Sequence, residues 1–203
     1  MGLYRDQLLP RVIDLVLSGD EFGKIRQRVA SGLSGEVLEV GFGSGLNVPF
    51  YPPAVERVLA VDPALIGRKL ARKRVAESRV AIEHVGLDAQ ALPLPSESVD
   101  HVLITWTMCS IPGPVDALAE MRRVLRPSGQ LHFAEHGRSS DPKVARWQDR
   151  LNPLQRAVAG GCHLNRRIDL LVEGAGFQLA HLDNFYMKGP KVTGYMYVGV
   201  ATK

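Results

Sequence analysis

The chain has few of the features that mark secreted, zinc-binding or membrane-spanning proteins. Its 203 residues include two cysteines, Cys109 and Cys162, which are not in C-x-x-C spacing. This scarcity argues against a disulfide framework and against a zinc site, and it fits a reducing compartment. Apolar runs such as Leu15-Val16-Leu17 are far shorter than the roughly 20 residues that span a bilayer, and the N-terminus has no signal-peptide pattern. We therefore expect a soluble, cytoplasmic protein without a transmembrane segment; peripheral contact with a membrane stays open.

Repeats, low-complexity tracts and a strong charge of one sign are also missing. The chain carries 25 basic and 21 acidic residues, and this formal net charge of +4 does not call for nucleic acid as a partner. A chain of this length, with 45% hydrophobic residues, fits one domain that buries its own core. We predict a single domain over residues 1–203, with residues 1–31 as a helical lid or cover and residues 36–203 as the core.

From residue 36 onward, strand-like and helix-like segments alternate. The expected strands are Val37–Val40, Val58–Val61, Val80–Val85, His101–Ile104, Leu131–Ala134, a run from Phe177, and Tyr195–Ala201. The expected helices are Ala64–Glu77, Val115–Leu125 and residues 141–176, the last interrupted at Asn152-Pro153 and at Gly160-Gly161. This alternation predicts an α/β protein with a parallel sheet covered by helices on both faces. The last two strands have no predicted helix between them, which indicates an antiparallel pair at the sheet edge.

One segment, V-L-E-V-G-F-G-S-G from Val37 onward, runs from an apolar strand through a carboxylate into a turn with glycine at every second position. Gly41, Gly43 and Gly45 remove Cβ atoms where the backbone turns sharply and where a ligand can approach closely. The spacing differs from the G-x-G-x-x-G of dinucleotide-binding turns. Glu39 would repel a pyrophosphate but would suit a ligand that carries an ammonium and a sulfonium group, so the pattern favours S-adenosylmethionine. The alternative interpretation is an ordinary tight turn.

Two further carboxylates follow predicted strands, where open α/β sheets bind their ligands. Asp62 ends the second strand, and its two oxygens could accept hydrogen bonds from both ribose hydroxyls. Asp88 follows the third strand and could accept from the adenine amino group, while Ala89 would present its backbone N–H to the ring. Each acid alone also fits a turn or a helix cap. Three acids in this order favour the cofactor site.

At this point the chain resembles the class I S-adenosylmethionine-dependent methyltransferases. The motifs that carry the resemblance are E-V-G-F-G-S-G, V-D-P, L-D-A-Q-A-L-P-L-P-S-E-S-V-D and R-R-V-L-R-P-S-G, within residues 36–136. The resemblance implies methyl transfer and a Rossmann-like three-layer sandwich: a seven-stranded, mostly parallel sheet with an antiparallel edge strand and, in this chain, extra N-terminal helices. The positions expected to bind the cofactor are Glu39, Gly41, Gly43, Gly45, Asn47, Asp62, Pro63, Asp88, Ala89 and Thr105.

A closer resemblance extends toward the C-terminus. It rests on Asn47 with Phe50-Tyr51-Pro52-Pro53, on Cys109-Ser110, on Glu135-His136 and on Gly161-Cys162. These motifs are similar to those of the animal membrane-associated thiol methyltransferases and their bacterial relatives, which are often labelled phospholipid methyltransferases. The sequence shows no counterpart of the hydrophobic N-terminal anchor of the animal proteins, so we do not expect it to reside in a membrane.

Few catalytic side chains are needed, because the methyl carbon of a sulfonium is already electrophilic and the protein mainly orients and desolvates the nucleophile. A thiol reacts as its thiolate, whereas an amine or phenol benefits from a base. His136 at the end of the fifth strand is the predicted base, with Glu135 next; the alternative for His136 is that it holds a loop. Trp106, Cys109 and Glu135 are the predicted substrate pocket, and packing is the alternative for Cys109.

No metal site is predicted. His163 is beside Cys162, and His132 is near His136, but neither pair has the spacing of a metalloenzyme motif. A regulatory pairing of Cys109 with Cys162 likewise has no support in their spacing.

The sequence therefore predicts S-adenosylmethionine-dependent methyl transfer to a small molecule, with a hydrophobic thiol or a lipid amine as the acceptor and S-adenosylhomocysteine as the product. No large target-recognition insertion is present, which argues against a macromolecular or nucleic-acid acceptor. Two alternatives remain: a nucleotide-dependent oxidoreductase on the same type of sheet, and a module that binds the cofactor without turnover.

Overall fold

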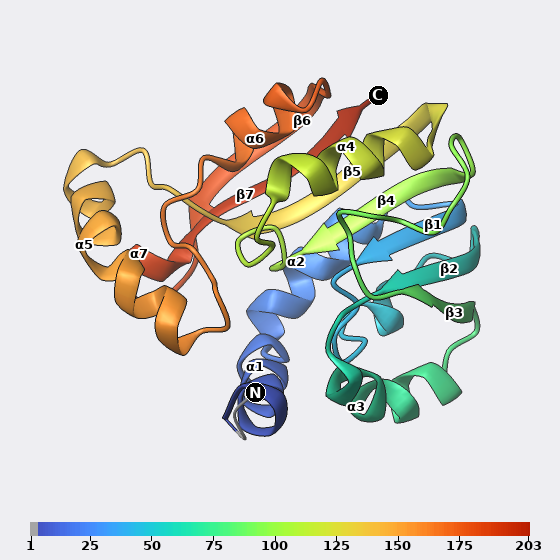
Figure 1. Ribbon diagram of the computed structural model, residues 1–203, viewed down its shortest axis with the longest axis horizontal. Helices are drawn as coiled ribbons and strands as arrows, with labels where there is room; N and C mark the ends of the chain where they lie inside the picture. The colour runs from blue at the N-terminus through green and yellow to red at the C-terminus, as the bar shows by residue number, and fades with distance from the viewer. Residues whose placement is uncertain (1–3) are drawn as a thin grey trace.

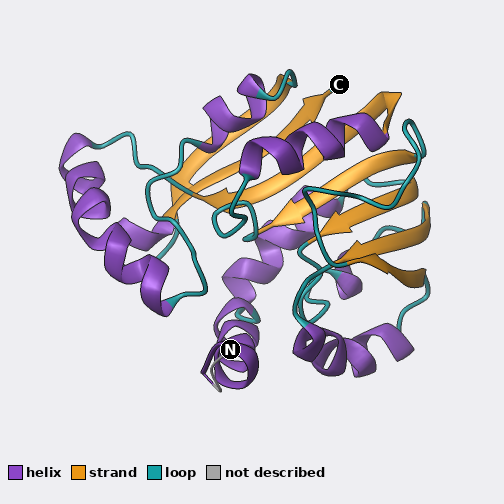
Figure 2. Cartoon of the chain, in the orientation of Figure 1, coloured by secondary structure: helices purple, strands orange, loops and turns teal. Residues whose placement is uncertain are grey.

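The computed structural model describes residues 4–203, which form a seven-stranded sheet with helices on both faces (Figures 1 and 2). The strands are β1 (Gly35–Val40), β2 (Val55–Val61), β3 (Ala81–Gly86), β4 (Val99–Thr105), β5 (Leu125–His136), β6 (Gln178–Tyr186) and β7 (Tyr195–Thr202). The helices are α1 (Leu9–Leu17), α2 (Asp20–Ala30), α3 (Leu65–Ala76), α4 (Pro114–Val124), α5 (Pro142–Val158), α6 (Ile168–Gly174) and α7 (Lys191–Gly194), with short helical turns at Tyr4–Leu8 and Val48–Phe50.

The strand order is β3-β2-β1-β4-β5-β7-β6. Strands β1 to β5 pair in parallel, and β7 runs antiparallel to both β5 and β6. The predicted antiparallel pair at the sheet edge is therefore confirmed, although the four-residue α7 separates its strands. Since the chain order reverses between β1 and β4, the carboxyl ends of these two strands form the crevice where such sheets bind ligands.

Alternating side chains of the central strands build two cores. On one face, Leu38, Val102 and Phe133 pack with α4 and α6, which cover the near side of the sheet in Figure 1. On the other face, Val37 and Leu103 pack against the buried side of α2. A strand buried on both faces is apolar at nearly every position, as these strands are. The α/β three-layer prediction is confirmed.

The predicted N-terminal cover divides into two different helices. In α2, Ile25, Val29 and Ala30 are buried in the core, so this helix is part of the domain itself. None of the nine residues of α1 is buried, and this helix lies beside the carboxyl ends of β1 and β4 (Figure 1). Residues 1–3 of the predicted cover lie outside the described residues.

One predicted helix interruption is wrong. Helix α5 continues through Asn152-Pro153 to Val158, although Pro153 cannot donate a backbone hydrogen bond. The Asn152 side chain accepts a hydrogen bond of 2.9 Å from the backbone N–H of Leu164, which ties this turn of the helix to the loop that follows. The interruption at Gly160-Gly161 is confirmed, and both glycines have positive φ angles.

Across residues 4–203, no helix combines the length and the apolar character needed to cross a membrane.

Candidate functional site

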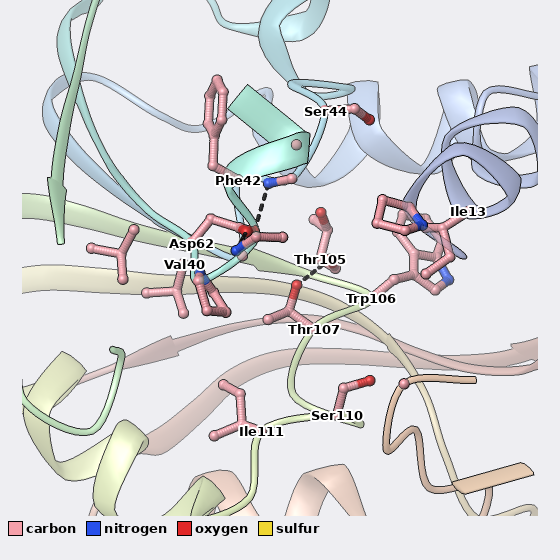
Figure 3. Close-up of a pocket in the computed structure, with 18 of the residues that line it drawn as sticks. Ile13, Val40, Phe42, Ser44, Asp62, Thr105, Trp106, Thr107, Ser110 and Ile111 are labelled. Atoms are coloured by element: carbon pink, nitrogen blue, oxygen red, sulfur yellow. Dashed lines mark hydrogen bonds between the residues drawn. The ribbon is translucent and has the colours of Figure 1, made fainter. Parts of the chain in front are cut away.

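A cavity of about 640 Å³ lies at the carboxyl ends of β1, β2 and β4 (Figure 3). Its volume falls within the range of small-molecule sites. The residues predicted from sequence that line it are Glu39, Gly41, Gly43, Asn47, Asp62, Pro63, Asp88, Ala89, Thr105 and Trp106. The fold thus brings together side chains that are up to 67 residues apart in the chain.

The glycine turn after β1 is needed for close approach. Gly41 has φ +77°, and a Cβ atom there would lie 2.0 Å from the Thr107 hydroxyl oxygen, so the turn and the loop after β4 touch. Gly43 has φ +54°, yet a Cβ there would meet no atom closer than 3.9 Å, because its open side faces the cavity. Gly45 does not line the cavity; it packs against Ala71 of α3 and so shapes the turn.

Asp62 fixes this turn from the end of β2. Its two carboxylate oxygens accept backbone hydrogen bonds from Gly43 at 2.7 Å and from Ala64 at 2.6 Å (Figure 3). Burial raises the pKa of Asp62, and the two backbone N–H groups oppose that rise. Each oxygen keeps a second lone pair, so the carboxylate can both shape the turn and accept from a ligand hydroxyl.

Glu39 lines the cavity with 1% of its surface exposed. It accepts a hydrogen bond of 3.0 Å from the Asn47 side-chain amide and another from the Tyr51 hydroxyl. Burial raises the pKa of Glu39 from 4.5 to about 7, while these hydrogen bonds and the charge of Arg26 pull it down. A cation entering the cavity would favour the ionised carboxylate.

Arg26 of α2 also lines the cavity, and our sequence reasoning missed it. Its guanidinium donates to the Asn47 side-chain oxygen at 2.7 Å and to the Thr105 hydroxyl at 3.0 Å. Burial lowers the pKa of Arg26 to about 10, opposed by the charge of Glu39. Its Nε atom has no hydrogen-bond partner within residues 4–203. The signal for it was present in the sequence, since Arg26 interrupts the apolar helical face formed by Ile25, Val29 and Ala30.

Trp106 is held in an unusual backbone conformation directly after β4. Its φ of +47° lies in the left-handed region, which bulky residues rarely adopt. Its ring packs edge-on against Phe22, with 5.2 Å between the ring centroids, and the Arg26 guanidinium lies 4.7 Å from the ring centroid. Contacts from α2 thus stabilise the turn that carries Trp106 to the cavity (Figure 3).

Asp88 and Ala89 form another part of the rim, beyond the end of β3. Asp88 is exposed, and its Oδ1 atom accepts from the backbone N–H of Gln90 at 2.9 Å. Asp88, Ala89 and Gln90 all line the cavity. This rim offers both a carboxylate and backbone groups to a ligand.

Cys109, Glu135 and His136 do not line this cavity. Glu135 is fully buried, and its carboxylate accepts the backbone N–H groups of Thr107, Met108 and Cys109 at 2.7, 2.9 and 3.3 Å. It shapes the loop instead of facing a substrate. The Nε2 atom of the buried His136 lies 3.0 Å from the Cys162 sulfur, so this geometry does not support His136 as a base at the cavity.

Helix α1 forms an apolar wall of the cavity through Leu9, Pro10, Ile13 and Leu17. Polar contacts attach both this helix and the helical turn Tyr4–Leu8 before it. Arg74 of α3 donates to Asp14 of α1 and to the backbone oxygen of Ser44, each at 2.9 Å. The Tyr4 hydroxyl donates to the backbone oxygen of Val158 at 2.6 Å. The wall therefore bridges α3 and the end of α5.

Comparison with known proteins finds methyltransferases. The family model described as "Methyltransferase domain" matches residues 38–133. Thiol S-methyltransferase TMT1A of Homo sapiens is 31% identical over 205 residues, which cover 95% of this chain and 80% of that protein. Thiol S-methyltransferase TMT1B of Rattus norvegicus is 37% identical over 160 residues, and this match spans 75% of the chain but only 64% of the rat protein. Phosphatidylethanolamine N-methyltransferase of Cereibacter sphaeroides is 31% identical over 141 residues, covering 61% of this chain and 66% of that protein.

The solved structures share the fold. A SAM-dependent methyltransferase from Thermotoga maritima superimposes with a TM-score of 0.72 at 21% identity, covering 99% of this chain and 98% of that one. Together with the human relative, which matches nearly the whole chain, the comparisons do not favour an oxidoreductase. The chain belongs to the family of class I S-adenosylmethionine-dependent methyltransferases.

Proposed function

We propose that the protein transfers a methyl group from S-adenosylmethionine to a small hydrophobic acceptor, with a thiol favoured over a lipid amine. The observation that carries this proposal is a single cavity lined by two chemically different sets of side chains. One set contains Glu39, Arg26 and Asp62, and the other consists of the apolar side chains of α1. Such a cavity suits a charged cofactor and an apolar acceptor side by side.

The polar set matches the amino-acid part of the cofactor. The buried carboxylate of Glu39 would attract its ammonium group, and the Arg26 guanidinium, with Nε free of partners within the described chain, would attract its carboxylate. Asp62 would accept from the ribose hydroxyls. Asp88 and Ala89 would contact adenine at their part of the rim. The predicted cofactor residues that line the cavity, together with Arg26, thus include a suitable partner for each part of the cofactor.

The lining of the cavity supports a thiol acceptor. Among the described residues that line it there is no histidine, lysine, cysteine or tyrosine, and the three carboxylates lie where the cofactor is expected. An acceptor therefore has to lose its proton without help from a side-chain base. A thiol has a reference pKa near 8.5 and an amine one near 10.4, so a thiol has the larger reactive fraction at neutral pH.

Helix α1 acts as the cover under which the acceptor enters. Its inner side chains face the cavity, while Leu15 and Val16 are 76% and 56% exposed. An exposed apolar helix of this kind also suits peripheral contact with a membrane that holds hydrophobic acceptors. Both buried cysteines are free thiols, which suits the reducing cytoplasm as the place of work.

Calorimetric titration with S-adenosylmethionine and S-adenosylhomocysteine tests the cofactor site. We expect saturable binding of both ligands, weakened at least about tenfold in Glu39→Gln because a charge-assisted hydrogen bond is lost. Glu83→Gln is the matched control, since Glu83 is an exposed carboxylate on β3 that does not line the cavity. Absence of binding to the wild-type protein, or equal weakening in both variants, would refute the proposed site.

The acceptor is tested with a matched pair, an alkyl thiol and the alkylamine of the same chain length. We expect methyl transfer to the thiol to be faster, with a rate that rises with pH as the thiolate fraction grows. Faster transfer to the amine would overturn the preference for thiols while leaving the cofactor site intact.

A further inference from the structure

Three side chains that could bind a thiophilic metal ion meet in the core beside the cavity. Cys109 follows β4, His136 ends β5, and Cys162 lies in the connection between α5 and α6. One potential ligand atom from each, two sulfurs and a ring nitrogen, lies within 4.8 Å of the others, and all three residues are buried. His136 Nε2 lies 3.0 Å from Cys162 Sγ.

Among the residues that the structure describes, one ring nitrogen of this cluster is unpaired, and each sulfur has a polar neighbour. The Nδ1 atom of His136 is buried and has no hydrogen-bond partner among residues 4–203. The Gln155 amide donates to the Cys162 sulfur at 3.6 Å, and the Ser110 hydroxyl lies 3.5 Å from the Cys109 sulfur. Neighbouring donors of this kind stabilise thiolates and orient metal ligands.

The donor set restricts what could bind. Two sulfurs and one imidazole suit zinc and other thiophilic ions, whereas magnesium and calcium require oxygen ligands. The neighbouring carboxylate, Glu135, is already engaged by three backbone N–H groups. A divalent ion held by two thiolates and a neutral imidazole carries no net charge, which makes its burial tolerable.

We propose that Cys109, His136 and Cys162 form a three-ligand site for a thiophilic divalent ion such as Zn²⁺, with water in the fourth position of the tetrahedral ion. Two metal–sulfur bonds and one metal–nitrogen bond form, and the two thiols release their protons to the solvent. The sequence predicts no metal site because the ligands stand 27 and 26 residues apart, which matches no short-spacing motif. The fold brings them together.

The ion would fasten the wall of the substrate cavity. Ser110 and Ile111, directly after Cys109, line that cavity. The backbone N–H of His163 already donates to the backbone oxygen of Cys109 at 2.9 Å, so the loop after β4 and the connection after α5 are neighbours. A metal bridge between Cys109 and Cys162 would hold these two segments in register.

The test is metal binding by the full chain, measured independently of methyl transfer. Reduced protein is loaded with Zn²⁺, exchanged into buffer with a competing chelator, and analysed for metal by mass spectrometry. We expect about one ion per chain, proton release on titration, and sulfur-to-cobalt charge-transfer absorption when Co²⁺ replaces Zn²⁺. Affinity should fall at least about tenfold in Cys109→Ser and in Cys162→Ser.

His163→Gln is the matched control, because His163 is adjacent to Cys162 in the chain but does not belong to the cluster. It should bind Zn²⁺ like the wild type. Circular dichroism and S-adenosylhomocysteine titration of each variant report whether it folds. Wild-type protein that retains no Zn²⁺, variants that retain it as the wild type does, or loss in the control equal to that in the cysteine variants would overturn the proposal. So would thiol titration showing that the purified protein holds a Cys109–Cys162 disulfide that forms in preference to the metal complex.

Discussion

Two groups of buried polar side chains lie at the same end of the sheet, and only one of them opens to the cavity. The first, which we call the open cluster, consists of Arg26, Glu39, Asn47 and Thr105. The second, the closed cluster, consists of Cys109, His136 and Cys162. Both are buried beneath the surface of the protein. They differ in charge: the open cluster contains a guanidinium and a carboxylate, and the closed cluster contains groups that can be neutral.

Burial alone therefore does not identify a ligand site. Ionised groups cost much free energy when they are removed from water, so the open cluster needs internal hydrogen bonds and a cavity beside it. The closed cluster avoids the cost of burying a charge, because thiols and a neutral imidazole are uncharged. In each cluster one nitrogen, Nε of Arg26 or Nδ1 of His136, has no hydrogen-bond partner within the described residues. An unpaired buried nitrogen is uncommon in folded proteins, so each of these two atoms marks a place where the network is incomplete.

Replacing the positively charged Arg26 of the open cluster should have the largest effect on stability and on ligand affinity. In Arg26→Met, Glu39 loses its neighbouring cation and Asn47 loses a donor at 2.7 Å. Leaving a buried polar group without its partner typically costs about 1 to 3 kcal/mol of stability, and we expect that loss at both Asn47 and Thr105, together with at least a tenfold weaker affinity for S-adenosylhomocysteine. Urea unfolding and calorimetry measure the two effects.

Arg28→Met is the control for this substitution. Arg28 is on the same helix, but its ion pair with Asp183 is exposed, with side-chain exposures of 46% and 44%. Its loss should change stability by at most about 1 kcal/mol. If Arg26→Met were no more destabilising than Arg28→Met, the open cluster would not be held together by Arg26.

The pH dependence of stability tests the same cluster without removing Arg26. Glu39 titrates at about 7 in the folded protein, whereas its reference value is 4.5. Between these pH values the folded state binds a proton that the unfolded state releases. The contribution of Glu39 is therefore fully present below pH 4.5 and is lost as the pH rises through about 7. The difference in pKa corresponds to about 3 kcal/mol.

We expect the stability of the wild-type protein, relative to Glu39→Gln, to fall by that amount between these pH values, as measured by urea unfolding at a series of pH values. The subtraction isolates Glu39, because Asp62 and Glu135 also have raised pKa values and act in both proteins. Parallel stability profiles would show that Glu39 titrates normally in the folded state.

The elements close to the glycine turn were predictable from sequence because their signals are local. The turn at Gly41 and Gly43 follows directly from the apolar strand before it, and Asp62 stands directly after another apolar strand. Chain spacing alone was therefore enough to suggest that they meet at the sheet edge. Helix α5 was predicted less well, since it continues through Pro153, where the Asn152 side chain also makes a tertiary hydrogen bond that no local pattern indicates.

The other parts of the two clusters depend on tertiary contacts. Arg26 precedes the glycine turn by 15 residues and reaches the cavity only because α2 folds back onto the sheet. For His136, the sequence indicates a strand end but not the direction of the side chain, which contacts Cys162. No local pattern encodes which distant segment packs against a strand end.

The smallest predicted effect concerns how an acceptor reaches the open cluster, and it compares the two sides of α1. Ile13 lines the cavity, whereas Leu15, 76% exposed, does not. Neither side chain is buried, so Ile13→Asp and Leu15→Asp should each change stability by about 0.5 kcal/mol or less. Only Ile13→Asp places a carboxylate against an apolar acceptor. We expect it to raise KM for an alkyl thiol about tenfold, equivalent to about 1.4 kcal/mol, with unchanged affinity for S-adenosylhomocysteine. Steady-state kinetics give the KM of both variants. Equal KM values would mean that the acceptor does not contact the side of α1 that faces the cavity, and so does not pass beneath this helix.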